Sequence, residues 1–186
     1  RKKVRKIAEG IYGASSIVYT TLAEKGREGR IILKMNGLQD SHMIDRLYEA
    51  SQRGVKIDLI VRGICCLIPG QTYSRNIRIT RIVDSFLEHA RVWYFGNDGN
   101  PKIFCGSPDW MRRNLYRRIE AITPILDPDL KKEMTDMLDI QLSDNQKACF
   151  VDDKLRNVFK HKTKGESVRA QYTFYNYLKN KNETGL

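Results

Sequence analysis

The segment at 55–67 is mostly apolar and reads Val55-Lys56-Ile57-Asp58-Leu59-Ile60-Val61-Arg62-Gly63-Ile64-Cys65-Cys66-Leu67. Apolar residues are almost continuous in its second half, as in a strand that is covered on both faces. We therefore predict a buried strand over 55–66. Such strands are typical of sheets with helices packed on both sides.

Strand-like and helix-like segments alternate upstream of this stretch. Residues 31–35 predict a mostly apolar strand that ends at Asn36-Gly37. Asp40 then predicts the N-cap of a helix, which Gly54 ends. The apolar stripe of this helix consists of Met43, Ile44, Leu47 and Ala50. A right-handed crossover makes the two strands parallel neighbours.

The segments downstream complete an α/β (α+β) pattern. Strands are predicted at 77–81, 91–95, 102–105 and 118–124, a turn at 97–100, and helices at 82–87, from 127 onward and at 169–180. In the helix from 127 onward, Asp127 is the N-cap and Pro128 the first helical residue. Its predicted apolar stripe consists of Leu130, Met134, Met137 and Leu138. Residues 1–29 predict a leading helical segment and residues 154–168 a basic loop, and we expect 1–186 to form a single domain.

Composition favours a globular domain, with 41% hydrophobic and 30% charged residues. No apolar run is long enough for a membrane helix, so no membrane span is expected. The basic start leads into no signal-peptide core and lacks an initiator Met. We therefore interpret the chain as a piece of a longer protein.

The formal net charge is +11, from 33 Lys and Arg against 22 Asp and Glu. Such an excess favours a polyanionic partner: nucleic acid, an acidic membrane surface, a nucleotide or a phosphate polymer. Charge alone does not choose among these, and a basic surface without a specific ligand is the alternative.

The four cysteines are Cys65, Cys66, Cys105 and Cys149. Two are adjacent in a strand-like run, which fits buried reduced thiols better than a disulfide framework. The absence of a Cys-x-x-Cys motif and of a His cluster argues against a structural zinc site. These features predict a cytoplasmic protein.

Arg62 is the first candidate site residue, because ligands bind at the carboxyl ends of strands in open α/β sheets. Its planar fork of donors suits phosphate oxygens. The alternative is that Arg62 pairs with an acidic neighbour such as Asp58 or Asp84.

The unit His89-Ala90-Arg91 places two phosphate-binding side chains at positions i and i+2, which share a face in an extended segment. A neutral imidazole can accept a phosphoryl group, and a protonated one can donate to phosphate. The alternative is a partly buried His89 bonded to a backbone carbonyl. We interpret His42 and His161 as surface residues.

The loop Gly106-Ser107-Pro108-Asp109 follows His89 by one predicted hairpin, and Asn114 comes shortly after it. Small residues let phosphate approach the backbone, and the Ser107 hydroxyl can donate to it. The pair Arg112-Arg113 adds positive charge to the same segment.

The order His-x-(Lys/Arg), hairpin, Gly-Ser-x-(Asn/Asp) resembles one half of the paired active site of the phospholipase D superfamily. That resemblance implies a phospholipase-D-like sandwich, a mixed sheet flanked by helices. The superfamily site needs two halves, each with one His. This chain has one half, with Arg91 where the motif has Lys and Asp109 where it usually has Asn.

A closer resemblance is to the C-terminal domain of bacterial polyphosphate kinases of the first type, and it extends from about residue 30 to 144. The segments that carry it are 31–36, 55–67, 86–89 and 106–114, and residues 168–178 also resemble the C-terminus of that family.

The resemblance implies a transferase that moves the terminal phosphate of ATP reversibly onto inorganic polyphosphate. It implies a phosphohistidine (hence a phosphoprotein) in a preceding domain, Mg²⁺ bound mainly by that domain, and a homo-oligomeric full-length enzyme. The isolated chain is then expected to be inactive alone. Arg62 and His89 match the ATP-phosphate-contacting Arg and the second His of the family.

We therefore expect Arg62 and His89 to be catalytic residues. The expected ATP- and phosphate-binding residues are Arg62, His89, Arg91, Ser107, Asp109 and Asn114. Two alternatives stay open: a phospholipase-D-like phosphodiesterase that acts as a dimer of half-sites, and a nucleic-acid-binding module without catalysis.

Overall fold

The structure is a computed structural model that describes residues 29–160 and 166–183. The leading helical segment predicted at 1–29 lies outside these ranges except for Gly29, and so does His161.

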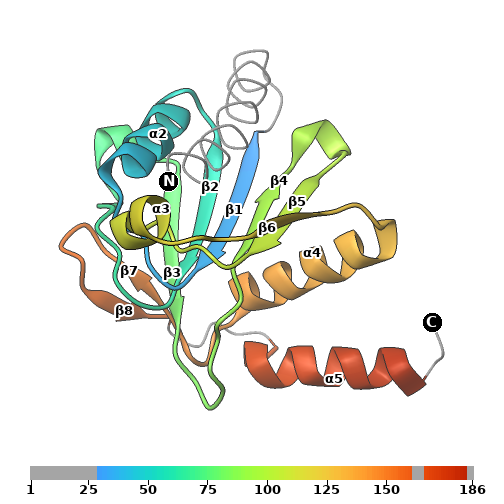
Figure 1. The fold of residues 1–186 in the computed structure, drawn as a ribbon. Coiled ribbons are helices and arrows are strands. Elements are labelled where there is room, and N and C mark those ends of the chain that lie inside the picture. Colours follow the sequence, from blue (N-terminus) through green and yellow to red (C-terminus); the bar gives the residue numbers. More distant parts are fainter. Residues whose placement is uncertain (1–28, 161–165, 184–186) are drawn as a thin grey trace.

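One eight-stranded sheet runs through the described chain, with the strand order β6-β5-β4-β1-β2-β3-β7-β8 (Figure 1). Its strands are β1 (Arg30–Met35), β2 (Lys56–Val61), β3 (Ile77–Ile82), β4 (Val92–Phe95), β5 (Lys102–Gly106), β6 (Ile122–Ile125), β7 (Ala148–Val151) and β8 (Asn157–Phe159). The β1–β2 and β2–β3 pairs are parallel and all other pairs are antiparallel. The predicted parallel pairing of the first two strands is confirmed.

Helices lie on both faces of the sheet, which confirms the predicted α+β class with a mixed sheet. They are α2 (Ser41–Gln52), α3 (Arg112–Arg117), α4 (Pro128–Ser143) and α5 (Ala170–Glu183), with short 3-10 turns η1 (Thr72–Ser74) and η2 (Asn97–Gly99). Both predicted N-caps are confirmed: Asp40 accepts the amide N–H of Met43, and Asp127 accepts two amides of the first turn of α4.

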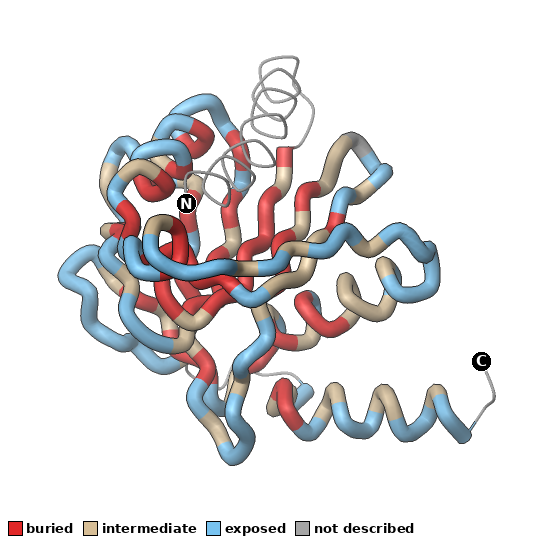
Figure 2. The backbone as a smooth tube through the Cα atoms, viewed as in Figure 1, coloured by how far each residue is buried: buried red, intermediate tan, exposed pale blue. Residues whose placement is uncertain are grey.

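Alternating residues of the central strands fill two cores, one on each face of the sheet. On the α2 side, Ile31 and Leu33 of β1 pack with the buried stripe of α2. On the other side, Ile32 packs with Met137 and Leu138 of α4, and α5 lies against α4. Figure 2 shows both cores as buried segments along the central strands. Leu130, predicted in the α4 stripe, is exposed because the first turn of α4 lies beyond the sheet.

The helix predicted at 82–87 is wrong. Ile82 is the last residue of β3, where it pairs with Ala148 of β7, and an extended loop follows. Side chains of α5 hold this loop: the Gln171 side chain accepts the Phe86 amide N–H and donates to the Phe86 carbonyl. These contacts between distant segments outweigh the local helical pattern.

Several other elements and boundaries differ from the prediction. The second strand ends at Val61 rather than at residue 66, because the chain bends at Arg62-Gly63. The unpredicted helix α3 delays the strand expected at 118–124, so that β6 begins at Ile122. Strand β7 was not predicted, and β8 lies within the expected loop 154–168. Helix α5 lies where a helix was predicted at 169–180 and extends to Glu183.

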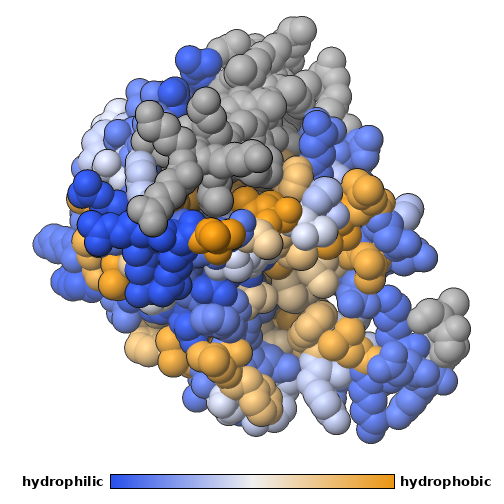
Figure 3. All heavy atoms as spheres, viewed as in Figure 1, coloured by the Kyte–Doolittle hydropathy of each residue, from blue (hydrophilic) through white to orange (hydrophobic). Residues whose placement is uncertain are grey.

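The surface of the described part is mostly polar, with one apolar tip. No helix in the described ranges has the length and apolar character needed to span a bilayer. The loop after β3 exposes Val83, Phe86 and Leu87, and Figure 3 shows hydrophobic atoms at the lower tip, where Figure 1 places that loop.

All four cysteines are free thiols.

Candidate functional site

The candidate site lies at the carboxyl ends of the parallel strands β1 and β2, where Asn36 and Arg62 leave the sheet. The amide N–H of Gly63 donates to the Asn36 carbonyl at 2.9 Å, so the two strand ends touch. A side chain at position 63 would place its Cβ 2.7 Å from that carbonyl oxygen. The close approach therefore requires glycine directly after Arg62.

Arg62 is half-buried, and its guanidinium has no hydrogen bond or ion pair with the residues that the structure describes. Both pairings considered as alternatives are wrong. Asp58 pairs with Arg78 at 2.8 Å, and Asp84 pairs with Arg169 at 2.6 Å. The Arg62 donors are thus available to a ligand.

Arg81 fixes the backbone on either side of Arg62. Its Nε donates to the Val61 carbonyl at 3.3 Å, and its Nη2 donates to the Gly63 carbonyl at 2.9 Å. The turn that carries Arg62 is therefore held by a neighbouring strand, β3.

His89 is exposed, and its main chain lies beside the same strand end. The His89 carbonyl accepts from Asn36 Nδ2 at 3.4 Å and from Arg91 Nη1 at 3.0 Å. Asn36 therefore contacts both the residue after Arg62 and His89, which brings the two predicted catalytic residues to one edge of the sheet. The predicted alternative of a partly buried His89 is wrong, because its side chain is exposed.

A buried ion pair lies under this edge. Lys34 is only 4% exposed, and its Nζ donates to Glu88 Oε2 at 2.7 Å. Glu88 also accepts from Gln141 Nε2 at 3.1 Å and Gln171 Nε2 at 3.2 Å. Glu88 directly precedes His89, so this network anchors the end of the loop that carries His89.

Burial lowers the pKa of Lys34 despite the raising effect of the Glu88 carboxylate, and the positive charge of Arg62 lowers that pKa further. Our sequence analysis missed both members of this buried pair. The available signal was a lysine inside the apolar strand at 31–35, because a buried lysine requires a partner.

Arg91 and Asp109, predicted as phosphate ligands, bind each other. The guanidinium donates to Asp109 through Nε at 3.2 Å and Nη2 at 3.0 Å, and the two side chains are 12% and 4% exposed. Asp109 Oδ1 also accepts the amide N–H groups of Asn36, at 2.7 Å, and Gly37, at 3.2 Å. Burial raises the pKa of Asp109, but the bonds from Arg91 and these amides outweigh it, so the net pKa lies below its ordinary value.

Ser107 and Asn114 are joined through Glu120, which our sequence analysis also missed. The Ser107 hydroxyl donates to one Glu120 carboxylate oxygen and accepts the Ala121 amide N–H. Asn114 Nδ2 donates to the other Glu120 oxygen at 2.7 Å. These bonds tie the loop after β5 to α3 and to the start of β6.

Within 29–160 and 166–183, no three His, Cys, Asp or Glu side chains gather in a group that could hold a metal ion. The carboxylates nearest the candidate site are each engaged: Glu88 by Lys34, and Asp109 by Arg91.

The chain resembles known proteins in sequence and in fold. The family model described as polyphosphate kinase C-terminal domain 2 matches residues 17–171. The polyphosphate kinase of Escherichia coli (strain K12) is 46% identical over 158 residues, which cover 84% of this chain and 23% of that protein. This chain thus spans about a quarter of the length of such relatives.

The crystal structure of polyphosphate kinase from Porphyromonas gingivalis has a TM-score of 0.93 and 51% identity, covering 96% of this chain and 28% of that one. Nuc from Salmonella typhimurium, a phospholipase D family member, is 14% identical with a TM-score of 0.50, covering 77% of this chain and 90% of Nuc. At that identity the likeness concerns the fold alone. By its family model and its relatives, the chain belongs to the family of the polyphosphate kinase C-terminal domain 2.

Proposed function

We propose that this chain supplies one half of a phosphoryl-transfer site, in which Arg62 and His89 contact phosphate. The full enzyme would transfer the terminal phosphate of ATP reversibly onto inorganic polyphosphate. The observation that carries the proposal is Arg62 at the carboxyl ends of two parallel strands, with no partner for its guanidinium in the described chain. Asn36, at the end of the neighbouring strand, bonds both the residue after Arg62 and the His89 carbonyl. The name shared by the relatives supports the substrates.

The chemistry suits these side chains. Phosphoryl transfer depends mainly on positioning and on stabilising charge that spreads over the phosphate oxygens. Arg62 offers a planar, permanently charged fork to two of those oxygens. An exposed imidazole such as His89 can donate to the transferred group or protonate the leaving oxygen.

The nucleophile in this proposal is a histidine of a preceding domain, which takes the phosphoryl group from ATP as ADP leaves. Mg²⁺ would neutralise phosphate charge, and we expect the preceding domain to hold it. Arg62 and His89 would face that histidine across the site. We expect the full-length enzyme to be a homo-oligomer in the cytosol, where the four free thiols stay reduced.

We assign the other predicted phosphate ligands to the frame of the site. The Arg91 and Asp109 side chains are largely buried and satisfy each other. Ser107 and Asn114 both bond to Glu120. A side chain that already bonds its neighbour would have to break that bond before it could bind phosphate.

The test uses the longer protein that carries this chain, and it measures ATP-dependent polyphosphate synthesis. We expect Arg62→Ala and His89→Ala each to lower turnover by roughly two decades or more, as does the loss of a transition-state contact. Arg75→Ala is the control, because Arg75 is exposed and lies beside η1. Near-normal turnover in both site variants would remove Arg62 and His89 from the mechanism.

The dependence on a second half-site has its own test. We expect this 186-residue chain to synthesise no polyphosphate by itself, and activity to appear when the preceding domains are present. Synthesis by the chain alone would make His89 the nucleophile and overturn the proposed division of roles.

A further inference from the structure

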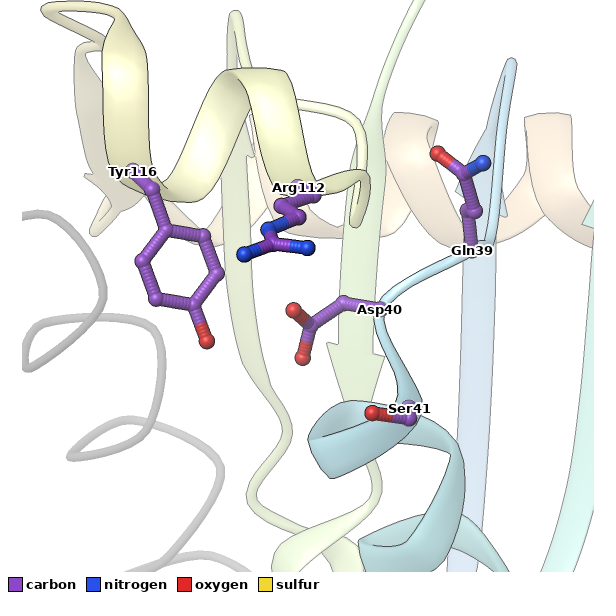
Figure 4. A pocket seen from close by; sticks show the side chains of 5 residues that line it. All are labelled: Gln39, Asp40, Ser41, Arg112 and Tyr116. Atoms are coloured by element: carbon purple, nitrogen blue, oxygen red, sulfur yellow. The ribbon is translucent and has the colours of Figure 1, made fainter.

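Two adjoining hollows lie beside helix α3 and share Gln39 and Arg112. The first has a volume of about 430 Å³ and is lined by Gln39, Asp40, Ser41, Arg112 and Tyr116. The second has a volume of about 320 Å³ and is lined by Gln39, Arg112, Arg113 and Arg117. Figure 4 shows the Arg112 guanidinium at the centre of the first hollow, between Tyr116 of α3 and the strand-to-helix segment that carries Gln39. Neither hollow includes Arg62 or His89.

The arginines of this region differ from most others in the chain. Arg112, Arg113, Arg117 and Arg118 lie within seven residues, all are exposed, and none has a hydrogen bond or ion pair with a residue that the structure describes. Of the ten other arginines in the described ranges, six pair with carboxylates: Arg30, Arg46, Arg78, Arg91, Arg156 and Arg169.

Like charges so close together repel one another, and Arg113 and Arg117 are one helical turn apart. Figure 3 shows a strongly hydrophilic band where Figure 1 places α3. Among the residues that the structure describes, none of these four arginines forms an ion pair with a carboxylate.

A short piece of backbone connects this surface to the candidate site. Asn36 donates to the His89 carbonyl, and three residues later the amide N–H of Gln39 donates to the Trp110 carbonyl at 2.8 Å. The Cα atoms of Asn36 and Gln39 can be at most about 11 Å apart. The arginine-lined hollows therefore lie close to the candidate site.

We propose that Arg112, Arg113 and Arg117 bind the distal phosphates of a polyphosphate chain whose reacting end lies at Arg62 and His89. The proposal rests on the proposed function and extends it to a second subsite. A polymer with a charge on every repeat can engage several arginine forks in succession, whereas the triphosphate of ATP ends within the first site.

The first hollow also contains a carboxylate, that of Asp40. This group is largely buried and accepts the Met43 amide N–H, and it would repel a phosphate placed next to it. The polyphosphate chain is therefore expected along the Arg113 and Arg117 side, with Arg112 between the two hollows.

The test compares a short and a long phosphate oligomer on the full 186-residue chain. The probes are tripolyphosphate and long-chain polyphosphate, and binding is measured by calorimetry at two salt concentrations. The variant is Arg112→Gln/Arg117→Gln. The matched control, Arg53→Gln/Arg75→Gln, removes the same charge from two exposed arginines that lie away from the hollows, one at the C-cap of α2 and one beside η1.

We expect the Arg112→Gln/Arg117→Gln variant to bind long-chain polyphosphate roughly tenfold more weakly, with a reduced salt dependence, because it loses two charge-assisted contacts. The affinity of this variant for tripolyphosphate should stay within about twofold of that of the unmodified chain, because Arg112 and Arg117 lie outside the first site. The control should keep both affinities within about twofold as well. Circular dichroism would show that each variant is folded.

Four results would overturn the proposal. One is a long-chain affinity that falls no more than in the control. Another is a loss of affinity for a single-stranded oligothymidylate that equals the loss for long-chain polyphosphate, which would make the cluster a nucleic-acid surface. If the unmodified chain binds both phosphate lengths equally, the second subsite alone is refuted, whereas failure to bind either length would also remove the proposed function.

Discussion

Replacing Asp109 by Asn removes the carboxylate charge on which four donors converge. Two are the backbone N–H groups of Asn36 and Gly37, and two belong to the Arg91 guanidinium. The asparagine oxygen can keep the two backbone bonds, but its amide N–H₂ then faces an Arg91 donor. Arg91, which is largely buried, loses its only carboxylate partner among the described residues.

The magnitude follows from the burial of the pair. Breaking a buried ion pair by removing one partner costs about 3–5 kcal/mol, because the remaining charge is uncompensated. We expect the lower end, about 3 kcal/mol, because part of Arg91 reaches solvent and its Nη1 still bonds the His89 carbonyl. A domain of ordinary stability, about 5–15 kcal/mol, would lose a large fraction of its free energy of unfolding.

Urea unfolding followed by tryptophan fluorescence measures this loss, since Trp93 and Trp110 are both buried. With a slope of about 1–3 kcal/mol per molar urea, a loss of about 3 kcal/mol should lower the midpoint by roughly 1–3 M. The matched control is Asp152→Asn, which breaks a pair with Arg156, whose side chain is 67% exposed. Its midpoint should shift far less, because surface ion pairs contribute little.

A double-mutant cycle decides whether the pair acts as a unit. If it does, Arg91→Gln/Asp109→Asn costs little more than either single change, because each single change already breaks the pair. Equal midpoint shifts for Asp109→Asn and Asp152→Asn would refute the structural role. Asp109 would then regain its place among the phosphate ligands.

Three further changes test other parts of the fold. The Arg169 bonds lower the pKa of Asp84 to about 2, so the stability from this carboxylate is present above pH 4 and is lost as pH falls toward 2. In Asp84→Asn, the free energy of unfolding should vary with pH by about 1 kcal/mol less over this range, after allowance for solvent screening. If the slope of unfolding free energy against pH is unchanged, the pairing is contradicted. Gly63→Ala should lower the free energy of unfolding by about 1–3 kcal/mol and lower the turnover of the longer protein, because the alanine Cβ would meet the Asn36 carbonyl. An unaltered urea midpoint and turnover would show that the turn can accommodate a Cβ. Leu47→Ala should lower the free energy of unfolding by about 2–5 kcal/mol, because Leu47 is fully buried. A loss below about 1 kcal/mol would show that the core repacks to fill the cavity.

The central fold could be predicted because its signals are local. The apolar run before Arg62, the caps Asp40 and Asp127 and the helical spacing in α2 each depend on residues a few positions apart. The place of Arg62 follows from the same pattern, since a residue after a buried parallel strand lies at the ligand-binding edge of the sheet.

The edges of the sheet could not be predicted, because β7 and β8 have only four and three residues. Strands this short carry little periodicity, and neighbouring strands rather than local propensity determine them. The loop after β3 shows the reverse case. Its helical pattern is overridden by Gln171 and Arg169, which lie 85 residues away along the chain.

By itself, the sequence determined which residue types bear charge, which segments are apolar with a helix or strand period, and that Arg62 and His89 follow β2 and precede β4. Only the tertiary structure decided which of these charges are already neutralised. Lys34 meets Glu88 across 54 residues, and Arg91 meets Asp109 across 18, while Arg62 meets no partner within the described chain. The physical reason is that a buried charge must find its partner in space, and the folded sheet, rather than the order of residues, sets those distances.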